Sequence, residues 1–409
     1  MPNEPISLIP RPRPEPTWRL TRALEQSASE PRLDDAQRRV VDHRAGALLV
    51  LAGPGTGKTT TLTEAVVARL NGTDAIKPSE VLVLTFARKA AGEIRERSIR
   101  RCGTSEVPAV STFHSLALSI VREYDSSGLG SVRLLSGPEQ ELRVREILSG
   151  IVNEVLVRDK VQWPETLREA LTTRGLTVEI RNALARAQSL GLSGDELLAA
   201  AQRHNQPEWV AVAHVLEEYL DNISQQRSLD YNELIHEAVR LTHDRRELTD
   251  ISQRYKAIYV DEYQDTDPMQ IQLLKNLAAP GTLLVAVGDP DQSIYGFRGA
   301  DSWAIRGFST DFEYLAPQMA VLNTTRRFGV HIRDAAYRVI ERNPLGDLPR
   351  EIKDEHRNLQ MDVDDDGEVR FRNFESAAAE AEEVAEHIRS EEHTSELQSH
   401  LNLVCRLLL

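Results

Sequence analysis

The stretch LVLAGPGTGKTTTL at residues 49–62 combines glycines, a lysine and a row of threonines, which is the composition of a phosphate-binding loop. Glycines allow backbone N–H groups to curve around a β-phosphate, Lys58 can reach the β- and γ-oxygens, and the Thr59 hydroxyl can ligate Mg²⁺. Ala52 replaces the first glycine of the strict pattern, so this loop is a variant of it. The residues expected to hold the nucleotide are Gly53, Gly55, Gly57, Lys58, Thr59 and Thr60.

A second group with chemical potential is the acidic pair in IYVDEYQD, residues 258–265, which follows an apolar run. A strand that ends in acids delivers them to the C-terminal edge of a parallel sheet, where a phosphate loop also lies. We expect Asp261 to complete the Mg²⁺ shell with Thr59, and Glu262 to orient or deprotonate an attacking water. The sequence contains no N-K-x-D guanine signature, so ATP is the expected nucleotide.

These side chains need a scaffold, and the apolar runs of the chain predict one. Runs rich in Val, Leu and Ile stand at residues 47–51, 80–86, 256–262 and 282–289 and alternate with helical segments. Continuous apolar strands separated by helices predict a parallel sheet buried on both faces, which makes the fold class α/β with a P-loop core. From about 131 to 228 the pattern is helical throughout, so we expect an inserted helical subdomain there.

Composition narrows the class of protein. The 409 residues suffice for two or three domains, and 49 basic against 63 acidic residues give a net charge of −14 at pH 7. A nucleic-acid surface must therefore be a local patch. Residues 87–102 carry six basic and two acidic side chains and are the candidate, with a solvated helix face as the alternative.

The cysteine content and the N-terminal sequence indicate the cellular compartment in which we expect the protein. Cys102 and Cys405 are too few for a disulfide framework or a four-cysteine metal site, which fits a reducing cytoplasm. No apolar stretch approaches the roughly 18 residues that span a bilayer, so we expect no membrane partner. Residues 1–32, rich in Pro and Arg, predict a disordered arm rather than a secretory signal.

Five strings, in this order, resemble the superfamily-one DNA helicases of the UvrD/Rep type and their helicase–nuclease relatives. They are LDDAQRRVV (33–41), TFARKAAGEIRER (85–97), STFHSLA (111–117), RSLDYNELI (227–235) and VGDPDQSIYGFRGAD (287–301). The resemblance, which runs to about residue 389, implies RecA-like motor domains that use ATP and Mg²⁺ to move 3′-to-5′ along single-stranded DNA and act at duplex–single-strand junctions. Residues 33–62 look most like actinobacterial helicase–nuclease subunits of the AdnA/AdnB kind, which implies a second subunit as a partner.

The resemblance also implies roles for single residues at the nucleotide. Gln37 would read the adenine edge, and Gln292 would sense the γ-phosphate. Arg326 aligns best with the arginine that reaches the γ-phosphate from the second motor domain and stabilises charge in the transition state; Arg327 is the alternative. Thr325 stands where the family has an aromatic residue, which removes the usual stacking partner of adenine.

Aromatic rings at strand ends are candidates for stacking on bases, a sequence-tolerant contact worth about 1–3 kcal/mol per base. Phe297, between a glycine and an arginine, is the preferred platform, whereas a lone phenylalanine elsewhere is more often part of a core. The resemblance implies that Arg298 couples DNA binding to ATP hydrolysis. The expected DNA contacts are Phe86, Arg88, Lys89, Phe113, His114, Tyr295, Phe297 and Arg298.

The domain plan has six parts. We expect the arm at 1–32, a first motor domain 1A at 33–130 and 229–316, the helical subdomain 1B at 131–228, the truncated start of a second motor domain 2A at 317–390, and a tail at 391–409. Residues 362–390 predict an acidic loop, a strand and a helix. The tail resembles translated sequencing-adapter sequence, so we expect it to be non-native; an ordinary terminal helix is the alternative.

Together these features predict an ATP-dependent DNA helicase or translocase of DNA repair or recombination. As an N-terminal fragment, the 409-residue chain itself is expected to bind nucleotide weakly, to leave duplexes intact, to show no strong DNA-stimulated ATPase and to aggregate through an exposed sheet edge. Two alternatives stay open. One is a DNA-stimulated ATPase that serves a repair complex without being a motor, and the other is an ATP-dependent protein-binding switch.

Overall fold

The computed structural model describes residues 31–72, 74–86, 88–102, 108–124, 133–152, 163–243, 251, 253–293, 303–342, 345 and 348–392; at residues 88, 102, 303 and 390–392 it describes the backbone alone. The described residues form two compact units. One lies within Met1–Arg327 and Asn343–Asp362, and the other within Phe328–Arg342 and Val363–Leu409. The phosphate loop and the acidic pair both belong to the first unit.

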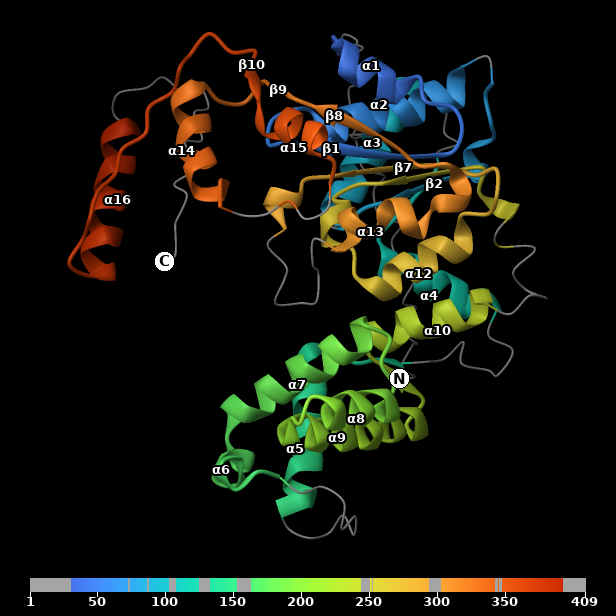
Figure 1. The fold of residues 1–409 in the computed structure, drawn as a ribbon, viewed down its shortest axis with the longest axis vertical. Helices are drawn as coiled ribbons and strands as arrows, with labels where there is room; N and C mark the ends of the chain where they lie inside the picture. Colours follow the sequence, from blue (N-terminus) through green and yellow to red (C-terminus); the bar gives the residue numbers. More distant parts are fainter. Residues whose placement is uncertain are drawn as a thin grey trace, which may run out of the picture. The chain divides into compact units, whose positions relative to one another are not determined.

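The first unit is built on a six-stranded sheet whose neighbouring strands all run parallel, in the order β3-β2-β6-β7-β1-β8 (Figure 1). Its strands are β1 (Ala47–Ala52), β2 (Val81–Leu84), β3 (Ala109–Ser111), β6 (Ala257–Val260), β7 (Leu283–Gly288) and β8 (Gln318–Leu322). The four apolar runs of the sequence are β1, β2, β6 and β7, so the predicted α/β fold class is confirmed.

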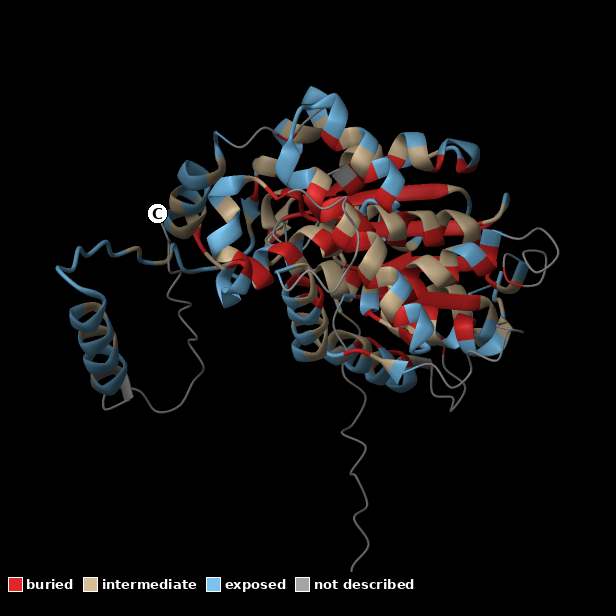
Figure 2. Cartoon of the chain, turned by 90° about the horizontal axis from the view of Figure 1, so that it is seen from below, coloured by how far each residue is buried: buried red, intermediate tan, exposed pale blue. Residues whose placement is uncertain are grey.

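Both faces of the sheet are buried because alternate side chains of a strand point to opposite sides. Leu48 and Val50 of β1 belong to an apolar cluster that includes residues of α1 (Asp35–Val41), α2 (Lys58–Asn71) and α3 (Arg88–Cys102). Leu49 and Leu51 belong to a second cluster on the other face. The helices that contribute to it are α4 (Phe113–Tyr124), α10 (Tyr231–His243), α12 (Pro268–Leu277) and α13 (Trp303–Asp311). Figure 2 shows the buried strands at the centre of this unit with helices on both sides.

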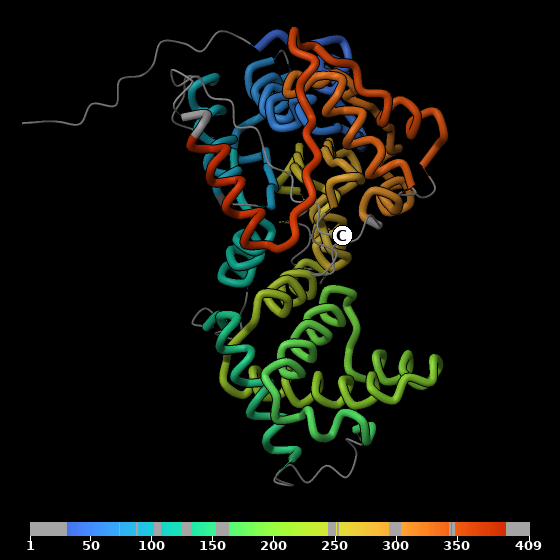
Figure 3. The backbone as a smooth tube through the Cα atoms, turned by 90° about the vertical axis from the view of Figure 1, so that its left-hand side faces the viewer, coloured from blue at the N-terminus to red at the C-terminus, as the bar shows by residue number. Residues whose placement is uncertain are grey.

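A group of helices with its own core is inserted between β3 and β6. It comprises α5 (Gly137–Val152), α6 (Glu165–Arg168), α7 (Arg174–Ser189), α8 (Gly194–Arg203) and α9 (Pro207–Gln225), with a short parallel pair, β4 (Arg133–Leu134) and β5 (Ser228–Leu229), at its two ends in sequence. Figure 3 shows the chain leaving the sheet toward these helices after α4 and returning through α10. The helices lie where the sequence predicts an insertion, and the assignment as subdomain 1B stays a prediction.

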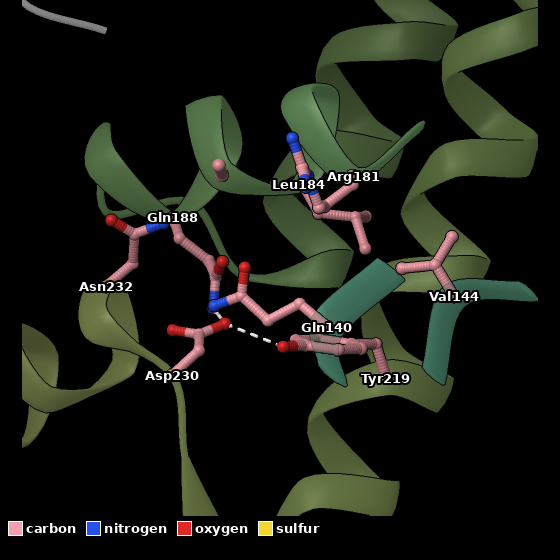
Figure 4. A pocket seen from close by; sticks show the side chains of 9 residues that line it. Gln140, Val144, Arg181, Leu184, Gln188, Tyr219, Asp230 and Asn232 are labelled. Carbon is pink, nitrogen blue, oxygen red and sulfur yellow. Dashed lines mark hydrogen bonds between the residues drawn. The ribbon is translucent and has the colours of Figure 1, made fainter. Parts of the chain in front are cut away.

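A buried carboxylate holds the junction between this helical group and the sheet. Asp230 is 2% exposed and accepts hydrogen bonds from the Tyr219 hydroxyl of α9 at 2.9 Å and the Gln188 amide of α7 at 3.3 Å (Figure 4). Its other oxygen accepts the backbone N–H of Glu233 at 2.8 Å, in the first turn of α10. One side chain therefore ties α7 and α9 to the start of α10, a helix that packs on the sheet.

The part of the chain that follows residue 317 differs from our expectation. β8 was expected to open a second motor domain at 317, but it pairs with β1 along its whole length as the edge strand of the first sheet. Farther along, α15 (Arg350–Arg357) and β10 (Gln360–Met361) also belong to this unit, and β10 pairs with β9 (Thr324–Thr325). The expected boundary at 317 is wrong because β1 offers its second edge to the next apolar segment, which periodicity along one strand does not reveal.

The second unit contains α14 (Val330–Ile340) and α16 (Ala377–Glu392). Gly329, at the start of α14, lies so close to the backbone of Asp365 that an added Cβ would come within 2.0 Å of its carbonyl oxygen. The backbone N–H of His331 donates to the Asp366 carbonyl at 3.0 Å, so the acidic loop is held against α14. The helix expected within 362–390 is present as α16, whereas residues 363–376 of the described chain form no strand.

Candidate functional site

The phosphate loop joins the end of β1 to the start of α2. Gly55 and Gly57 adopt left-handed φ values of +77° and +86°, which favour glycine. A Cβ at Gly55 would also lie 2.4 Å from Thr325 Oγ1, and one at Gly57 would lie 2.7 Å from the amide nitrogen of Gln37. Because Gly57 at the N-cap has no side chain to cap α2, the N–H groups of the first turn can bind an anion.

The acidic pair follows β6, which is two strands from β1 in the sheet. Asp261 Oδ2 accepts the Thr59 hydroxyl at 3.3 Å, and Glu262 Oε2 lies 3.6 Å from the Lys58 ammonium. Among the residues that the structure describes, Glu262 is one of four non-glycine residues with a positive φ, at +52°, a conformation that is retained only where the surroundings enforce it. The four side chains that the sequence nominates for phosphate, metal and water chemistry therefore meet at one edge of the sheet.

The donor set fits the ligands that the sequence predicts. Hydroxyl and carboxylate oxygens, as in Thr59 and Asp261, are the ligands that Mg²⁺ prefers. The ammonium of Lys58 and the open N–H groups of α2 match the charge of a polyphosphate. Thr60 lies in the same first turn of α2 and is half-buried.

A residue that the sequence analysis missed links the acidic pair to Asp289, in the string at 287–301. The Gln264 amide donates to Glu262 Oε2 at 2.8 Å, and its oxygen accepts the backbone N–H of Asp289 at 2.9 Å. Gln264 is 2% exposed, so these bonds are shielded from water. Only its position two residues after Glu262 could have drawn attention to it, because the bond to Asp289 depends on the packing of β6 beside β7.

Burial sets the protonation of the acids. Desolvation, followed by the charge of Glu262, raises the pKa of Asp261 from its ordinary value of 3.8 to about 6. The same two causes raise the pKa of Asp265 to about 6. The folded chain therefore binds protons between about pH 4 and pH 6 that the unfolded chain has released, and this contribution to stability is lost as pH rises through that window.

Replacing Asp261 with asparagine should therefore stabilise the chain without added ligands at pH 8, by roughly 3 kcal/mol if the whole pKa shift is relieved. The asparagine oxygen can still accept the Glu262 N–H, and its amide can donate to Thr59. Thermal unfolding midpoints of parent and variant should differ more at pH 8 than at pH 5. Equal unfolding midpoints of parent and variant at pH 8, or a larger difference at pH 5 than at pH 8, would contradict the raised pKa of Asp261.

Gln37 braces the phosphate loop in this structure. Its oxygen accepts the backbone N–H of Asp34 at 3.1 Å, and its amide donates to the Thr56 carbonyl at 3.0 Å. The first bond belongs to a capping box at the start of α1. Gln37 is 3% exposed. Recognition of adenine by Gln37 stays a prediction.

Arg326 and Arg327 both contact the phosphate loop. The Arg326 backbone N–H donates to the Gly55 carbonyl at 3.0 Å, and the Thr325 hydroxyl donates to the Pro54 carbonyl at 2.9 Å. The Arg326 guanidinium binds Asp34 at 3.0 Å and Asp362 at 3.1 Å. Arg327 is exposed with its Cβ beside Gly55, so both arginines remain candidates for the γ-phosphate.

Gln292 ends the turn that follows β7, and its amide donates to the Asp289 carboxylate. The nominated DNA contacts that come next, Tyr295, Phe297 and Arg298, lie outside the described residues, as does the side chain of Arg88. These nominations stay predictions.

The remaining DNA candidates divide by burial. Phe86, at the end of β2, is 37% exposed, as a stacking platform requires. Phe113 is 5% exposed and belongs to the apolar core between α4 and the sheet, so its nomination as a platform is wrong: its ring is needed for packing. His114 is half-buried and meets Tyr231 edge to face at 5.4 Å.

The basic helix α3 is less positive than its composition indicates. Arg97 pairs with Glu93, and Arg100 lies 3.8 Å from Glu96, each one helical turn away. Arg101 pairs with Glu64 of α2 at 3.1 Å. Lys89 and Arg95 are exposed on the same helix. Part of this charge therefore stabilises α3 itself, and the patch that could meet phosphates is correspondingly smaller.

The region that contains this site is similar in sequence to known proteins. A family model, the UvrD/REP helicase N-terminal domain, matches residues 33–313. The chain is 33% identical over 316 residues to the ATP-dependent DNA helicase PcrA of Staphylococcus aureus, and 32% identical over 327 residues to the ATP-dependent DNA helicase UvrD1 of Mycobacterium leprae. Each match covers 76% of this chain, and the chain spans about 40% of the length of these relatives.

Proposed function

Because this chain belongs to the UvrD/REP helicase family, we propose that it forms the first ATP-binding motor domain of an ATP-dependent DNA helicase or translocase. The observation that carries the proposal is the meeting of Lys58 with Glu262 at 3.6 Å and of Thr59 with Asp261 at 3.3 Å, at the C-terminal ends of β1 and β6. The PcrA and UvrD1 relatives, named as ATP-dependent DNA helicases, support it.

In this proposal each residue has one task. Lys58 and the N–H groups of α2 bind the phosphates, and Thr59 and Asp261 hold Mg²⁺, which when bound neutralises phosphate charge. Glu262, fixed by its left-handed backbone and by Gln264, orients or deprotonates the attacking water. Gln292 and either Arg326 or Arg327 respond to the γ-phosphate, and all three belong to the compact unit that carries the phosphate loop.

The finer assignments belong to the same proposal. Residues 131–228 correspond to subdomain 1B, and single-stranded DNA and its junctions with duplex are the substrates, with 3′-to-5′ movement and a second helicase–nuclease subunit as expected by resemblance. Among the described helices, none has the length and apolar character to cross a bilayer. A cytoplasmic location is part of this proposal, because two cysteines fit a reducing compartment.

Binding of a fluorescent oligothymidine, followed by anisotropy at low salt, tests the proposal against its rivals. We expect single strands to bind and to compete better than blunt duplex. A chain that binds ATP but no single strand would favour a protein-binding switch. In a protein with the full length of these relatives, ATP turnover that rises with DNA while labelled duplexes stay paired would favour a non-motor ATPase, because this chain alone is expected to leave duplexes intact.

Phe86 and Phe113, which lie in the family-like strings at 85–97 and 111–117, provide a matched pair of variants for this assay. Phe86→Ala should weaken single-strand binding by about 1–3 kcal/mol and leave the thermal midpoint unchanged, because an exposed platform ring stacks on a base. Phe113→Ala should instead destabilise the fold by about 3–5 kcal/mol, because its ring is in the core. If Phe86→Ala unfolds the chain and leaves the affinity of the folded fraction intact, the platform assignment is wrong.

A further inference from the structure

The segment formed by α15 and β10 lies on the nucleotide-binding edge of the sheet. β10 pairs with β9, whose Thr325 donates to the Pro54 carbonyl of the phosphate loop. Leu359 packs on the same loop so closely that a Cβ at Gly53 would lie 3.0 Å from its Cδ2. A part of the chain that the sequence analysis assigned to another domain therefore contacts the first motor domain next to its phosphate loop.

The last turn of α15 also grips the turn after β7, residues 289–292. His356 is 3% exposed, and its Nε2 lies 3.2 Å from Asp289 Oδ1 and 3.7 Å from Asp291 Oδ2. Arg357 binds both oxygens of Asp291, at 3.1 Å through Nε and at 2.7 Å through Nη2. Such a bidentate pair fixes orientation as well as distance. Neighbouring residues of one helix thus hold the two acids of this turn.

Gln292 depends on the same carboxylate. Asp289 Oδ2 accepts the Gln292 amide, while Oδ1 receives His356 and the Asp291 N–H at 3.0 Å. Burial raises the pKa of Asp289, but the hydrogen bond and charge of His356, together with Lys58 and the Asp291 N–H, hold this pKa below its ordinary value. The carboxylate that binds the Gln292 amide is therefore itself held in place by a side chain of α15.

A bound metal ion is the alternative explanation for the cluster of Asp289, Asp291 and His356. The ligand atoms of Asp289, Asp291 and His356 lie within 4.8 Å of one another, as a bound cation requires. However, the Arg357 guanidinium already binds both oxygens of Asp291, and the amide of Gln292 already donates to Asp289. A cation would have to displace the Gln292 amide and the Arg357 guanidinium from these carboxylates and would lie beside the positive charge of Arg357. We therefore interpret the cluster as one that holds Gln292 in position.

We propose that His356 and Arg357 are positioning residues for Gln292, which they hold in the orientation that distinguishes ATP from ADP. This inference rests on the proposed function and extends it to a segment outside the matched family region, 33–313. It implies that α15 contributes to nucleotide discrimination without touching the nucleotide. Loss of either residue should therefore affect the response to the γ-phosphate and spare the grip on the α- and β-phosphates.

The test measures affinities for ADP and for a non-hydrolysable ATP analogue by calorimetry, both with Mg²⁺. Arg357→Ala and His356→Ala should lower the preference for the ATP analogue about two- to tenfold, the effect of one well-placed hydrogen bond, with ADP affinity unchanged. His356→Gln, which keeps an N–H donor toward Asp289, should retain the preference. Arg350→Ala, which removes an exposed pair with Asp354 on the same helix, is the matched control and should change neither affinity.

A double mutant separates positioning from general damage to the fold. If Arg357 acts through Gln292, adding Arg357→Ala to Gln292→Ala should have no further effect on the ADP-to-ATP preference. Additive effects, or equal losses for both nucleotides, overturn the inference while the proposed function stands. A parent chain that binds neither nucleotide overturns the proposed function, and with it this inference. Metal-dependent stabilisation of the parent that is lost in His356→Ala without added nucleotide would support the cation reading instead.

Discussion

Glu262→Gln should lower the basal ATP turnover of the chain by about 10²- to 10⁴-fold, the usual contribution of a positioned general base. Glutamine keeps the size of the side chain and can still accept a hydrogen bond from Gln264, but it cannot take a proton from water. Loss of the negative charge also removes the ion pair with Lys58, so affinity for ATP should be unchanged or higher. Steady-state hydrolysis and analogue binding, measured on the same preparations, separate the two effects.

The matched control for this substitution is Glu80→Gln. Glu80 precedes β2 and binds Lys256, which precedes β6, at 2.7 Å, so this pair lies at the opposite, N-terminal edge of the same sheet. Glu80→Gln should leave turnover unchanged. Equal turnover of Glu262→Gln and the parent would remove Glu262 from the catalytic role and leave the acidic pair with a structural one.

Lys58→Ala should weaken ATP binding roughly 10- to 100-fold, as expected for loss of a hydrogen bond to a charged phosphate. The ammonium lies in the first turn of α2, where the backbone N–H groups continue to bind the phosphates, so the residual affinity should not be zero. Lys256→Ala, at the N-terminal edge, is the control that removes an equal charge. Calorimetry that finds the same affinity for both variants would contradict the phosphate role of Lys58.

The strands and the nucleotide motifs were predictable because local sequence determines them. A parallel strand buried on both faces reads as an unbroken apolar run, and β1, β2, β6 and β7 all show this pattern. The phosphate loop and the acids follow such strands directly, so their shared edge follows from the fold class. β3 has only three residues, none of which is buried, so it shows no comparable apolar run.

Contacts between distant segments were not predictable from spacing. Arg326 binds Asp34 across 292 residues, and His356 reaches Asp289 across 67. Each pair depends on which strands become neighbours, and β8 beside β1 decides much of this arrangement. The burial of Phe113 was not predictable either. The sequence of a DNA-contacting motif does not show whether an aromatic ring packs into the core or faces solvent.

The proposed function depends on Thr59 and Asp261 holding Mg²⁺ for a nucleotide bound by Lys58. Calorimetric titration of a non-hydrolysable ATP analogue into the parent chain and into Asp261→Asn, with Mg²⁺ and with chelator, tests it most directly. Thermal midpoints of parent and variant, measured at pH 8 on the same preparations, separate a loss of binding from unfolding. We expect Mg²⁺ to tighten binding of the analogue in the parent and to have little effect in the variant; an equal Mg²⁺ dependence in both would show that Asp261 does not hold the ion.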